Sequence, residues 1–221
     1  MHTLLAITAH PDDESFLFGG ALAAHAARGG RTGLLCLTDG QVGRTGGLVA
    51  PEGLGAMRHE EMRRAAAVLG IPHLFQPGHM DGALKAIGDE EGAAIVARCA
   101  EEFRADVLLT FGPEGASGHE DHKCCWRWTV AAAGDRPVYA ATFPDDYEGR
   151  VRGGTPLSVT TVIDVSSIGD AKRRAFLEHR TQQDHLELLD QVHAALGGKE
   201  YYHRVRPAWQ EGDPLESELR V

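Results

Sequence analysis

The stretch LLAITAHPDDES, residues 4–15, decides the fold of this chain. Residues 3–8 are apolar enough to form a short strand that is buried on both faces. Pro11 ends this strand, and His10 and three consecutive acids at 12–14 crowd the turn that follows. The three carboxylates repel one another, and a turn has no structural need for all of them. The end of the first strand is therefore a candidate functional site.

Beyond this stretch the chain alternates strand-like and helix-like segments. Apolar runs predict further strands at residues 32–37, 73–76, 106–111, 137–142 and 158–165. Helix-like patterns lie at 15–28, 55–69, 90–104, 119–133 and 168–196, the last expected to break into two. This alternation predicts a single-domain α/β fold, with a Rossmann-like, mostly parallel sheet and helices on both faces. We expect one domain over residues 1–197 and an irregular extension of it, charged and proline-containing, over 198–221.

The topology of such a sheet brings two polar turns together. Ligands bind at the carboxyl ends of parallel strands, where the strand order reverses. In the common order 3-2-1-4, the first strand neighbours the strand DVLLTF at 106–111, which leads into GPEGASGHEDH at 112–122. The turn after the first strand and the segment GHEDH should therefore face each other across one crevice.

Charge and hydrophobicity exclude several classes of partner. The formal net charge of −10 argues against nucleic acid and against an anionic membrane surface, since both need a basic face. No apolar stretch approaches the roughly 20 residues of a membrane span, and residues 1–7 do not resemble a signal peptide. We therefore expect a cytoplasmic protein with no membrane partner. The four cysteines fit neither a zinc ribbon nor a disulfide framework, so we interpret them as reduced core thiols.

The residue types in the two turns predict a metal site. His10 and Asp13 can meet one ion at a strand-to-helix turn, and His119 and His122 share one face of a helix start. Taken singly, a solvated helix start or an acidic first helical turn would explain each motif. Together they favour a cation, and imidazole with carboxylate suits zinc, although iron(II) accepts the same ligands. Three such ligands leave one coordination position for water, as in catalytic zinc sites. A dinucleotide site is not indicated, because the first turn lacks the GxGxxG motif.

Six sequence segments together resemble the LmbE/PIG-L-like family of zinc-dependent de-N-acetylases. Besides AHPDDE and GHEDH, they are TDGQVGRTGG (38–47), RHEEMRRAAAVLG (58–70), MDG (80–82) and KRRAFLEHRTQ (172–182). The resemblance covers nearly the whole chain up to about residue 185. It implies a metal-dependent amidohydrolase that acts on a small N-acetyl amino sugar with one zinc per chain, and it leaves a homo-oligomer open.

The resemblance also implies roles for individual residues. It assigns the metal ligands to His10, Asp13 and His122, and the general base to Asp12. His119 would steady the oxyanion as an imidazolium, with Asp121 as the partner that orients it. Substrate contacts would fall to Arg58, Asp81 and Arg44. An exposed helix arginine, a turn aspartate and a solvated loop arginine are the rival interpretations of these three.

Two features leave the reaction partly open. The family usually has HPDH where this chain has His119-Glu120-Asp121-His122, so Glu120 replaces a proline without changing the spacing of the histidines. The loop GQVGRTGG (40–47) looks most like members that deacetylate N-acetylglucosaminyl malate in bacillithiol biosynthesis. The alternatives are a mycothiol-pathway deacetylase of the inositol conjugate, a mycothiol S-conjugate amidase, and a catalytically silent metal-containing protein that binds a sugar. A metallophosphoesterase fits less well, since such enzymes usually hold two metals.

Overall fold

The computed structural model describes residues 2–147 and 154–220 of the chain. Within these residues the strands form one seven-stranded sheet in the order β3-β2-β1-β4-β5-β7-β6. The strands are β1 (Thr3–Thr8), β2 (Arg31–Cys36), β3 (His73–Phe75), β4 (Val107–Thr110), β5 (Val138–Thr142), β6 (Thr161–Asp164) and β7 (Lys199–Arg206). The first five strands of this order pair in parallel, and β7 pairs antiparallel with both of its neighbours. The predicted mostly parallel α/β sheet is thus confirmed.

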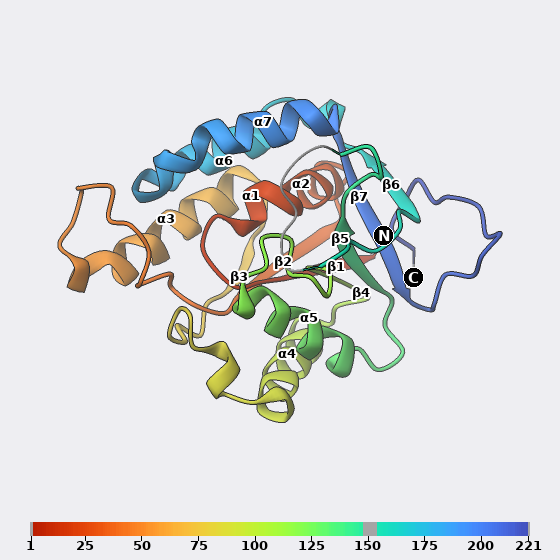
Figure 1. Cartoon of the computed structure of the whole chain (residues 1–221), viewed down its shortest axis with the longest axis horizontal. Helices are drawn as coiled ribbons and strands as arrows, with labels where there is room; N and C mark the ends of the chain where they lie inside the picture. The colour runs from red at the N-terminus through yellow and green to blue at the C-terminus, as the bar shows by residue number, and fades with distance from the viewer. Residues whose placement is uncertain (1, 148–153, 221) are drawn as a thin grey trace.

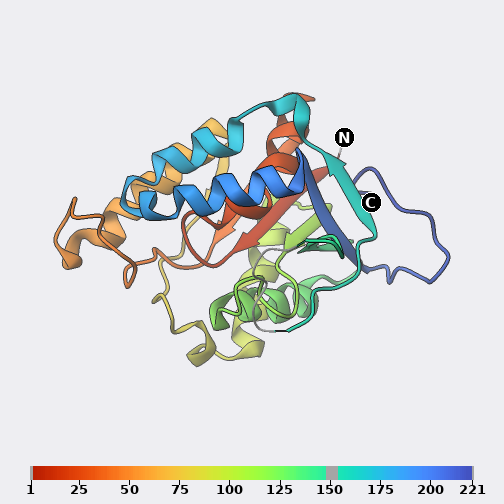
Figure 2. The ribbon, with the colours of Figure 1, turned by 45° about the horizontal axis from the view of Figure 1, so that its top comes forward.

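Helices cover both faces of the sheet (Figure 1). They are α1 (Asp13–Leu17), α2 (Gly19–Ala27), α3 (Leu54–Val68), α4 (Asp89–Phe103), α5 (Glu120–Ala132), α6 (Ala171–Glu178) and α7 (Leu186–Leu196). Figures 1 and 2 show α4 and α5 on one face and the other helices on the opposite face. The predicted break in the segment 168–196 is confirmed, because a short 3-10 helix over Arg180–His185 separates α6 from α7.

Strand β1 lies in the middle of the sheet and carries the opening motif to its carboxyl edge. It pairs in parallel with β2 on one side and β4 on the other, and all six of its residues are buried. The chain runs from β1 to β2 in one direction along the sheet and reaches β4 on the other side, so the order reverses beside β1. The turns after β1 and β4 therefore meet at the switch point, as the sequence predicted.

The first helical segment begins earlier than expected and is broken in two. The pattern predicts one helix over 15–28, but α1 ends at Leu17 and α2 begins at Gly19, with Phe18 between them at φ −127°. The Glu200 carboxylate accepts the backbone N–H groups of Gly20 and Ala21, each at 2.8 Å. A side chain from β7 thus satisfies the donors at the start of α2, which sequence periodicity cannot reveal.

The expectation of an irregular tail over 198–221 is wrong, because residues 199–206 form β7 between β5 and β6. Burial alternates at the start of this strand, where Glu200 and Tyr202 are buried and Tyr201 is partly exposed. The strand escaped notice because one of its inward positions is charged. Glu200 tolerates burial because Lys172 Nζ lies 2.8 Å from its carboxylate. The side chain of Lys172 is also almost fully buried.

The Glu200–Lys172 pair leads to a prediction about stability. Replacing Glu200 with glutamine leaves the Lys172 ammonium buried without a counter-charge. We expect the free energy of unfolding to fall by about 3–5 kcal/mol, the usual cost of breaking a buried ion pair from one side. Urea unfolding followed by circular dichroism measures this change. Glu218→Gln is the matched control, since the side chain of Glu218 is 71% exposed, and an equally small effect of both substitutions would contradict the prediction.

All four cysteines belong to the hydrophobic core. Cys36, Cys99, Cys124 and Cys125 are all buried free thiols, as the sequence predicted. Trp128, Tyr139, Tyr202 and Phe18 are among the largest fully buried side chains.

None of the helices in residues 2–147 and 154–220 combines the length and hydrophobicity that a membrane span requires.

Candidate active site

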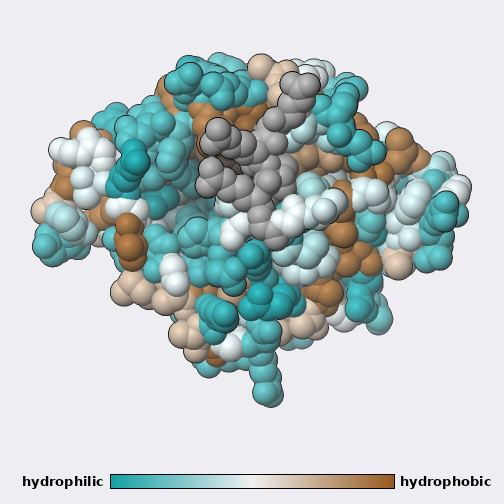
Figure 3. Space-filling model, viewed as in Figure 1, coloured by the Kyte–Doolittle hydropathy of each residue, from teal (hydrophilic) through white to brown (hydrophobic). Residues whose placement is uncertain are grey.

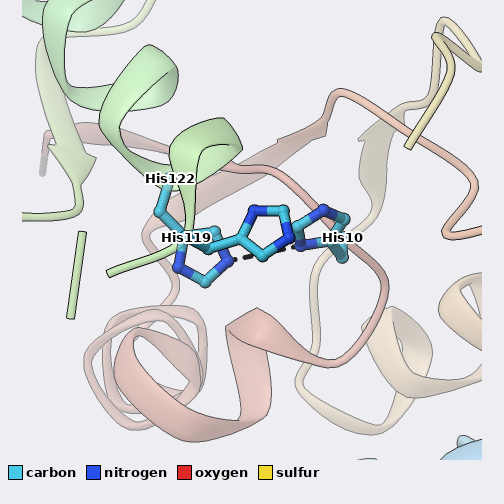
Figure 4. A group of neighbouring side chains, drawn as sticks. All are labelled: His10, His119 and His122. Atoms are coloured by element: carbon cyan, nitrogen blue, oxygen red, sulfur yellow. Dashed lines mark hydrogen bonds between the residues drawn. The ribbon is translucent and has the colours of Figure 1, made fainter. Parts of the chain in front are cut away.

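The two polar turns meet in one cavity of about 1010 Å³. His10 and the acids after it enter from the end of β1, and His119 and His122 enter from the start of α5. Figure 4 shows the three imidazoles gathered around one point, with a dashed line between His10 and His122. These residues are more than 100 positions apart in sequence, so the predicted meeting of the two turns is confirmed.

Three candidate ligand atoms lie at the spacing of a metal site. His10 Nδ1 is 3.3 Å from His122 Nε2, His122 Nε2 is 3.2 Å from Asp13 Oδ1, and His10 Nδ1 is 3.7 Å from Asp13 Oδ2. Two atoms about 2.0–2.1 Å from one zinc ion at tetrahedral angles lie about 3.3–3.4 Å apart. The two distances to His122 Nε2 therefore fit a zinc ion, and the Asp13 carboxylate approaches His10 through its other oxygen.

In both imidazoles, the ring nitrogen that faces away from the candidate metal position already has a hydrogen-bonding partner. The other nitrogen therefore carries the lone pair and faces that position. His122 Nδ1 donates to the Gly115 carbonyl at 2.9 Å, so Nε2 carries the lone pair. His10 Nε2 lies 2.9 Å from Asp81 Oδ1 and 3.3 Å from Asp121 Oδ2, which leaves Nδ1 free to bind a cation. A carboxylate or carbonyl behind each histidine is the usual arrangement around metal ligands.

Asp13 is held in the same way. Its Oδ2 accepts the backbone N–H groups of His10 at 2.8 Å and Ala9 at 3.2 Å, so that Oδ1 remains for a cation. Burial opposes its charged form, but the charges and hydrogen bonds of His122 and His10 hold the pKa of Asp13 below its usual range. Burial likewise opposes a charged His10, yet Asp121, Asp81 and Asp13 outweigh it and raise the pKa of His10 to about 10 without metal. A bound cation can balance the negative charge of these carboxylates around His10, just as a proton does.

Two other groups of possible ligands share His10. Ligand atoms of His10, His119 and His122 lie within 4.8 Å of one another, as do those of His10, Asp81 and Asp121. Hydrogen bonding separates His119 from the ligand set, because its Nδ1 accepts the N–H of Asp121 at 3.2 Å as the N-cap of α5. A ring that accepts at Nδ1 carries its proton on Nε2, and a protonated nitrogen cannot bind a metal.

The same hydrogen bond corrects the charge expected on His119. The resemblance implies an imidazolium, but a protonated Nδ1 cannot accept an N–H. Burial and the charges of His10 and His122 lower the pKa of His119. The hydrogen bond thus favours a neutral His119 with its proton on Nε2, from which it can donate to an oxygen in the cavity.

Asp12 has an unusual backbone. Its φ is 115°, a left-handed conformation that few non-glycine residues adopt. Burial, reinforced by Asp13 and opposed by Arg58, raises the pKa of Asp12 to about 6. A carboxylate in a strained conformation with a raised pKa, in the wall of a cavity, is typical of a functional group.

A buried pair behind Asp12 supports this conformation. Glu14 is fully buried, and its Oε2 accepts the backbone N–H of Asp12 at 3.0 Å. Its Oε1 lies 2.8 Å from Nε2 of His179, which is also fully buried. The sequence motifs assign no role to His179. The signal for His179 is its place in the segment KRRAFLEHRTQ, but no spacing within the sequence links it to Glu14.

Asp121 and Asp81 both face His10. The Asp121 carboxylate accepts the N–H of Gly82 at 2.7 Å and of Leu84 at 3.2 Å, and it lies beside His10 Nε2. Among the described residues it contacts His10 with its side chain, whereas only its backbone contacts His119. Asp121 therefore orients His119 through its backbone N–H, and its carboxylate orients His10 instead.

The two candidate substrate arginines occupy different environments. Arg58 is 3% exposed, which rules out the exposed helix arginine, and it lines the cavity. Its guanidinium donates to the carbonyls of Gly40 and Pro11 and lies 3.5 Å from Asp12 Oδ2. Arg44 is a surface residue that pairs with Asp184 at 2.9 Å, and it is not among the described residues that line the cavity.

Glu120, which stands where the related sequences have proline, is the first residue of α5. Its side chain is 53% exposed and pairs with Lys123 at 2.8 Å. An exposed acid in a first helical turn is favourable, so the substitution leaves His119 and His122 in place.

Comparison with known proteins supports an assignment to one family. The family model described as PIG-L, GlcNAc-PI de-N-acetylase, matches residues 5–133. A probable N-acetyl-alpha-D-glucosaminyl L-malate deacetylase 2 of Bacillus anthracis is 30% identical over 67% of this chain and 69% of its own length. A 1D-myo-inositol 2-acetamido-2-deoxy-alpha-D-glucopyranoside deacetylase of Rhodococcus jostii is 32% identical over 81% of each chain.

Solved structures share the fold. The conserved protein TT1542 of Thermus thermophilus superposes with a TM-score of 0.74 at 25% identity, over 95% of this chain and 97% of its own. GalB, a 4-carboxy-2-hydroxymuconate hydratase of Pseudomonas putida, superposes with a TM-score of 0.65 at 20% identity, over 96% and 100%. Because a hydratase has this architecture, the fold by itself does not determine the reaction.

Proposed function

The chain belongs to the GlcNAc-PI de-N-acetylase (PIG-L) family of amide hydrolases, and on this premise we propose that it removes the acetyl group from an N-acetylglucosaminyl conjugate with one bound zinc ion. One observation carries the proposal. His122 Nε2 lies 3.3 Å from His10 Nδ1 and 3.2 Å from Asp13 Oδ1, in the cavity that Asp12 and His119 also line. A binding protein would need the ligands but neither of the other two groups.

A zinc ion held by these three residues would supply Lewis-acid activation of a water molecule and of the amide carbonyl. The remaining steps belong to side chains of this chain. Asp12 accepts a proton from the attacking water, whose oxygen forms a bond to the carbonyl carbon. His119 Nε2–H donates to the developing oxyanion. As the C–N bond breaks, Asp12 returns the proton to the nitrogen, so that amine and acetate leave.

The protein around these groups fixes their positions. Glu14 holds the backbone of Asp12, and Arg58 holds Pro11 and faces the Asp12 carboxylate. Asp81 and Asp121 keep His10 in the tautomer that presents Nδ1. We assign Arg58 and Asp81 mainly to this positioning, although both also line the cavity where a sugar would bind.

The names of the relatives support two finer substrates. The Bacillus anthracis relative is named for N-acetylglucosaminyl malate and the Rhodococcus jostii relative for the inositol conjugate, at similar identity. We retain the malate conjugate of bacillithiol biosynthesis as the first compound to test and the inositol conjugate as the second. Arg44, which would hold a malate carboxylate, pairs with Asp184 in this structure and would have to exchange that partner.

An amine-release assay on the purified chain tests the proposal. Both conjugates are incubated with protein that has been stripped by chelator and then reloaded with zinc or with iron(II). We expect release of free amine and acetate only from metal-loaded protein. Metal binding without release from either conjugate would instead favour the silent sugar-binding alternative.

The raised pKa of Asp12 predicts the pH dependence of the reaction. Only the deprotonated carboxylate can accept a proton, so kcat/KM should fall as the pH drops through about 6 and level off above it. The charge of a bound metal would move this limb to lower pH, never higher. Because acid also protonates the histidine ligands, metal content is measured at every pH. A profile without any acidic limb, down to the lowest pH at which the metal is retained, would contradict the role of Asp12.

A further inference from the structure

One wall of the cavity has no part in the chemistry proposed above. The imidazoles of His10, His119 and His122 gather in one part of the lining (Figure 4), which Asp12 and Asp13 also enter. Another part, which we call the apolar wall, consists of Phe16, Leu17, Phe143, Leu188, Val192 and Ala195. These residues come from α1, from the segment after β5 and from α7, so three separate elements contribute apolar side chains to it.

Helix α7 contributes a regular stripe to this wall. Leu188, Val192 and Ala195 are spaced four and three apart and therefore lie on one face of the helix. Leu189 and Leu196, on a neighbouring face, are buried in the protein. Leu188, in contrast, is 53% exposed although it lines the cavity. Val192 is also buried, so the apolar surface that this helix leaves uncovered consists of Leu188 and Ala195 on either side of it.

The surface view agrees with this arrangement. Figure 3 shows hydrophobic surface in the area where Figure 1 shows α7, below the hydrophilic upper edge. Exposed leucines that stand alone on a surface need no explanation. Leu188 is not such an isolated leucine, because it lines a cavity together with apolar side chains from two other segments. One ligand can remove all of these side chains from water together.

The size of the cavity leaves room for a second group. Cavities of about 300–1,000 Å³ hold drug-sized ligands, and this one has about 1010 Å³. One N-acetylated sugar with its acetamide at the metal ligands would leave the apolar wall uncovered. The wall is continuous with the candidate metal site, so the group that covers it is the part of the substrate attached to the sugar.

We propose that the apolar wall binds an apolar aglycone, so that the substrate is an N-acetylglucosaminyl conjugate with an alkyl or aromatic group linked to the sugar. This inference rests on the proposed function, since it takes the acetamide to lie at His10, Asp13 and His122. It narrows the substrate class, because malate and inositol are both polar and would gain little from this wall. Removing alkyl groups from water is favourable in proportion to the area buried.

Methyl and hexyl glycosides of N-acetylglucosamine, of the same anomer, test the inference. Their affinities are measured by calorimetry on the zinc-loaded Asp12→Asn protein, so that turnover does not interfere. We expect the hexyl glycoside to bind at least about tenfold more tightly, because up to five additional methylene groups leave water. Equal affinities would overturn the proposal.

Variants locate the effect. Leu188→Gln should reduce the ratio of hexyl to methyl affinity, whereas Leu215→Gln should leave it unchanged. Leu215 is the matched control because it is 63% exposed and lies outside the cavity lining. An unchanged ratio in the Leu188 variant would place the alkyl group elsewhere and overturn the assignment. Deacetylation by the unmodified protein is measured separately, so that failure of the reaction is distinguished from failure of the apolar wall.

Discussion

Replacing Asp12 with asparagine should lower kcat by about 10³-fold while the protein keeps its metal, since general-base catalysis contributes about 10²–10⁴-fold. Asparagine has the shape of aspartate and cannot accept a proton from water. It is also among the residues that tolerate positive φ, so the backbone at 115° should persist. Turnover of an N-acetylglucosaminyl conjugate and metal content per chain are measured on the same preparation.

The choice of asparagine separates chemistry from folding. Alanine at position 12 would also remove the carboxylate, but it is poorly suited to the backbone conformation there. Asp190→Asn serves as the control, because Asp190 pairs with Arg173 on the surface, 45% exposed, and should leave kcat unchanged. Activity of the Asp12 variant within tenfold of the unmodified protein would show that another group moves the proton.

Replacing His122 with alanine should abolish stoichiometric zinc binding and all activity that depends on it. Loss of a group that merely supports a ligand costs about 10–100-fold in metal affinity, so loss of a ligand should cost more than about 100-fold. The His122 ring also stacks on Phe111 with centroids 4.0 Å apart, and thermal unfolding checks that the variant still folds. Zinc is quantified after dialysis against a weak chelator.

His119→Ala is the matched comparison, since it removes an imidazole from the same turn of the same helix. We expect this variant to keep its zinc and to lose about 10²–10³-fold in kcat, the typical cost of removing one oxyanion donor. The reason is the tautomer of His119, which the N–H of Asp121 fixes with the proton on Nε2. Loss of zinc from the His119 variant and retention by the His122 variant would reverse the two assignments.

The surroundings of these groups explain why one fold serves several reactions. The sheet order brings the ends of β1 and β4 together, and that property is shared with a hydratase. The chemistry depends on which side chains stand at those ends and on what the rest of the cavity accepts. In this protein the ends carry His10, Asp12, Asp13, His119 and His122, the residues to which we assign the reaction, and α7 and Phe143 line other parts of the cavity.

The sequence by itself determined the α/β class, the central position of the first strand and the meeting of the two polar turns. These follow from local rules, because alternating apolar runs predict a parallel sheet and its switch point lies beside the first strand. The motifs also predicted a metal site at His10, Asp13, His119 and His122, and the family resemblance implied which of these residues bind the metal. Sequence alone did not find β7, because a buried glutamate in its pattern made the strand look like a charged tail.

Only the tertiary structure decided how each group is held. Burial of Arg58, the pairing of Glu14 with His179 and the neutral tautomer of His119 depend on partners far away in the sequence. Asp12 has a raised pKa because the folded chain removes it from water beside Asp13, and no residue type encodes that burial. Local pattern fixes which elements form, whereas the energies of charged groups depend on what surrounds them in three dimensions.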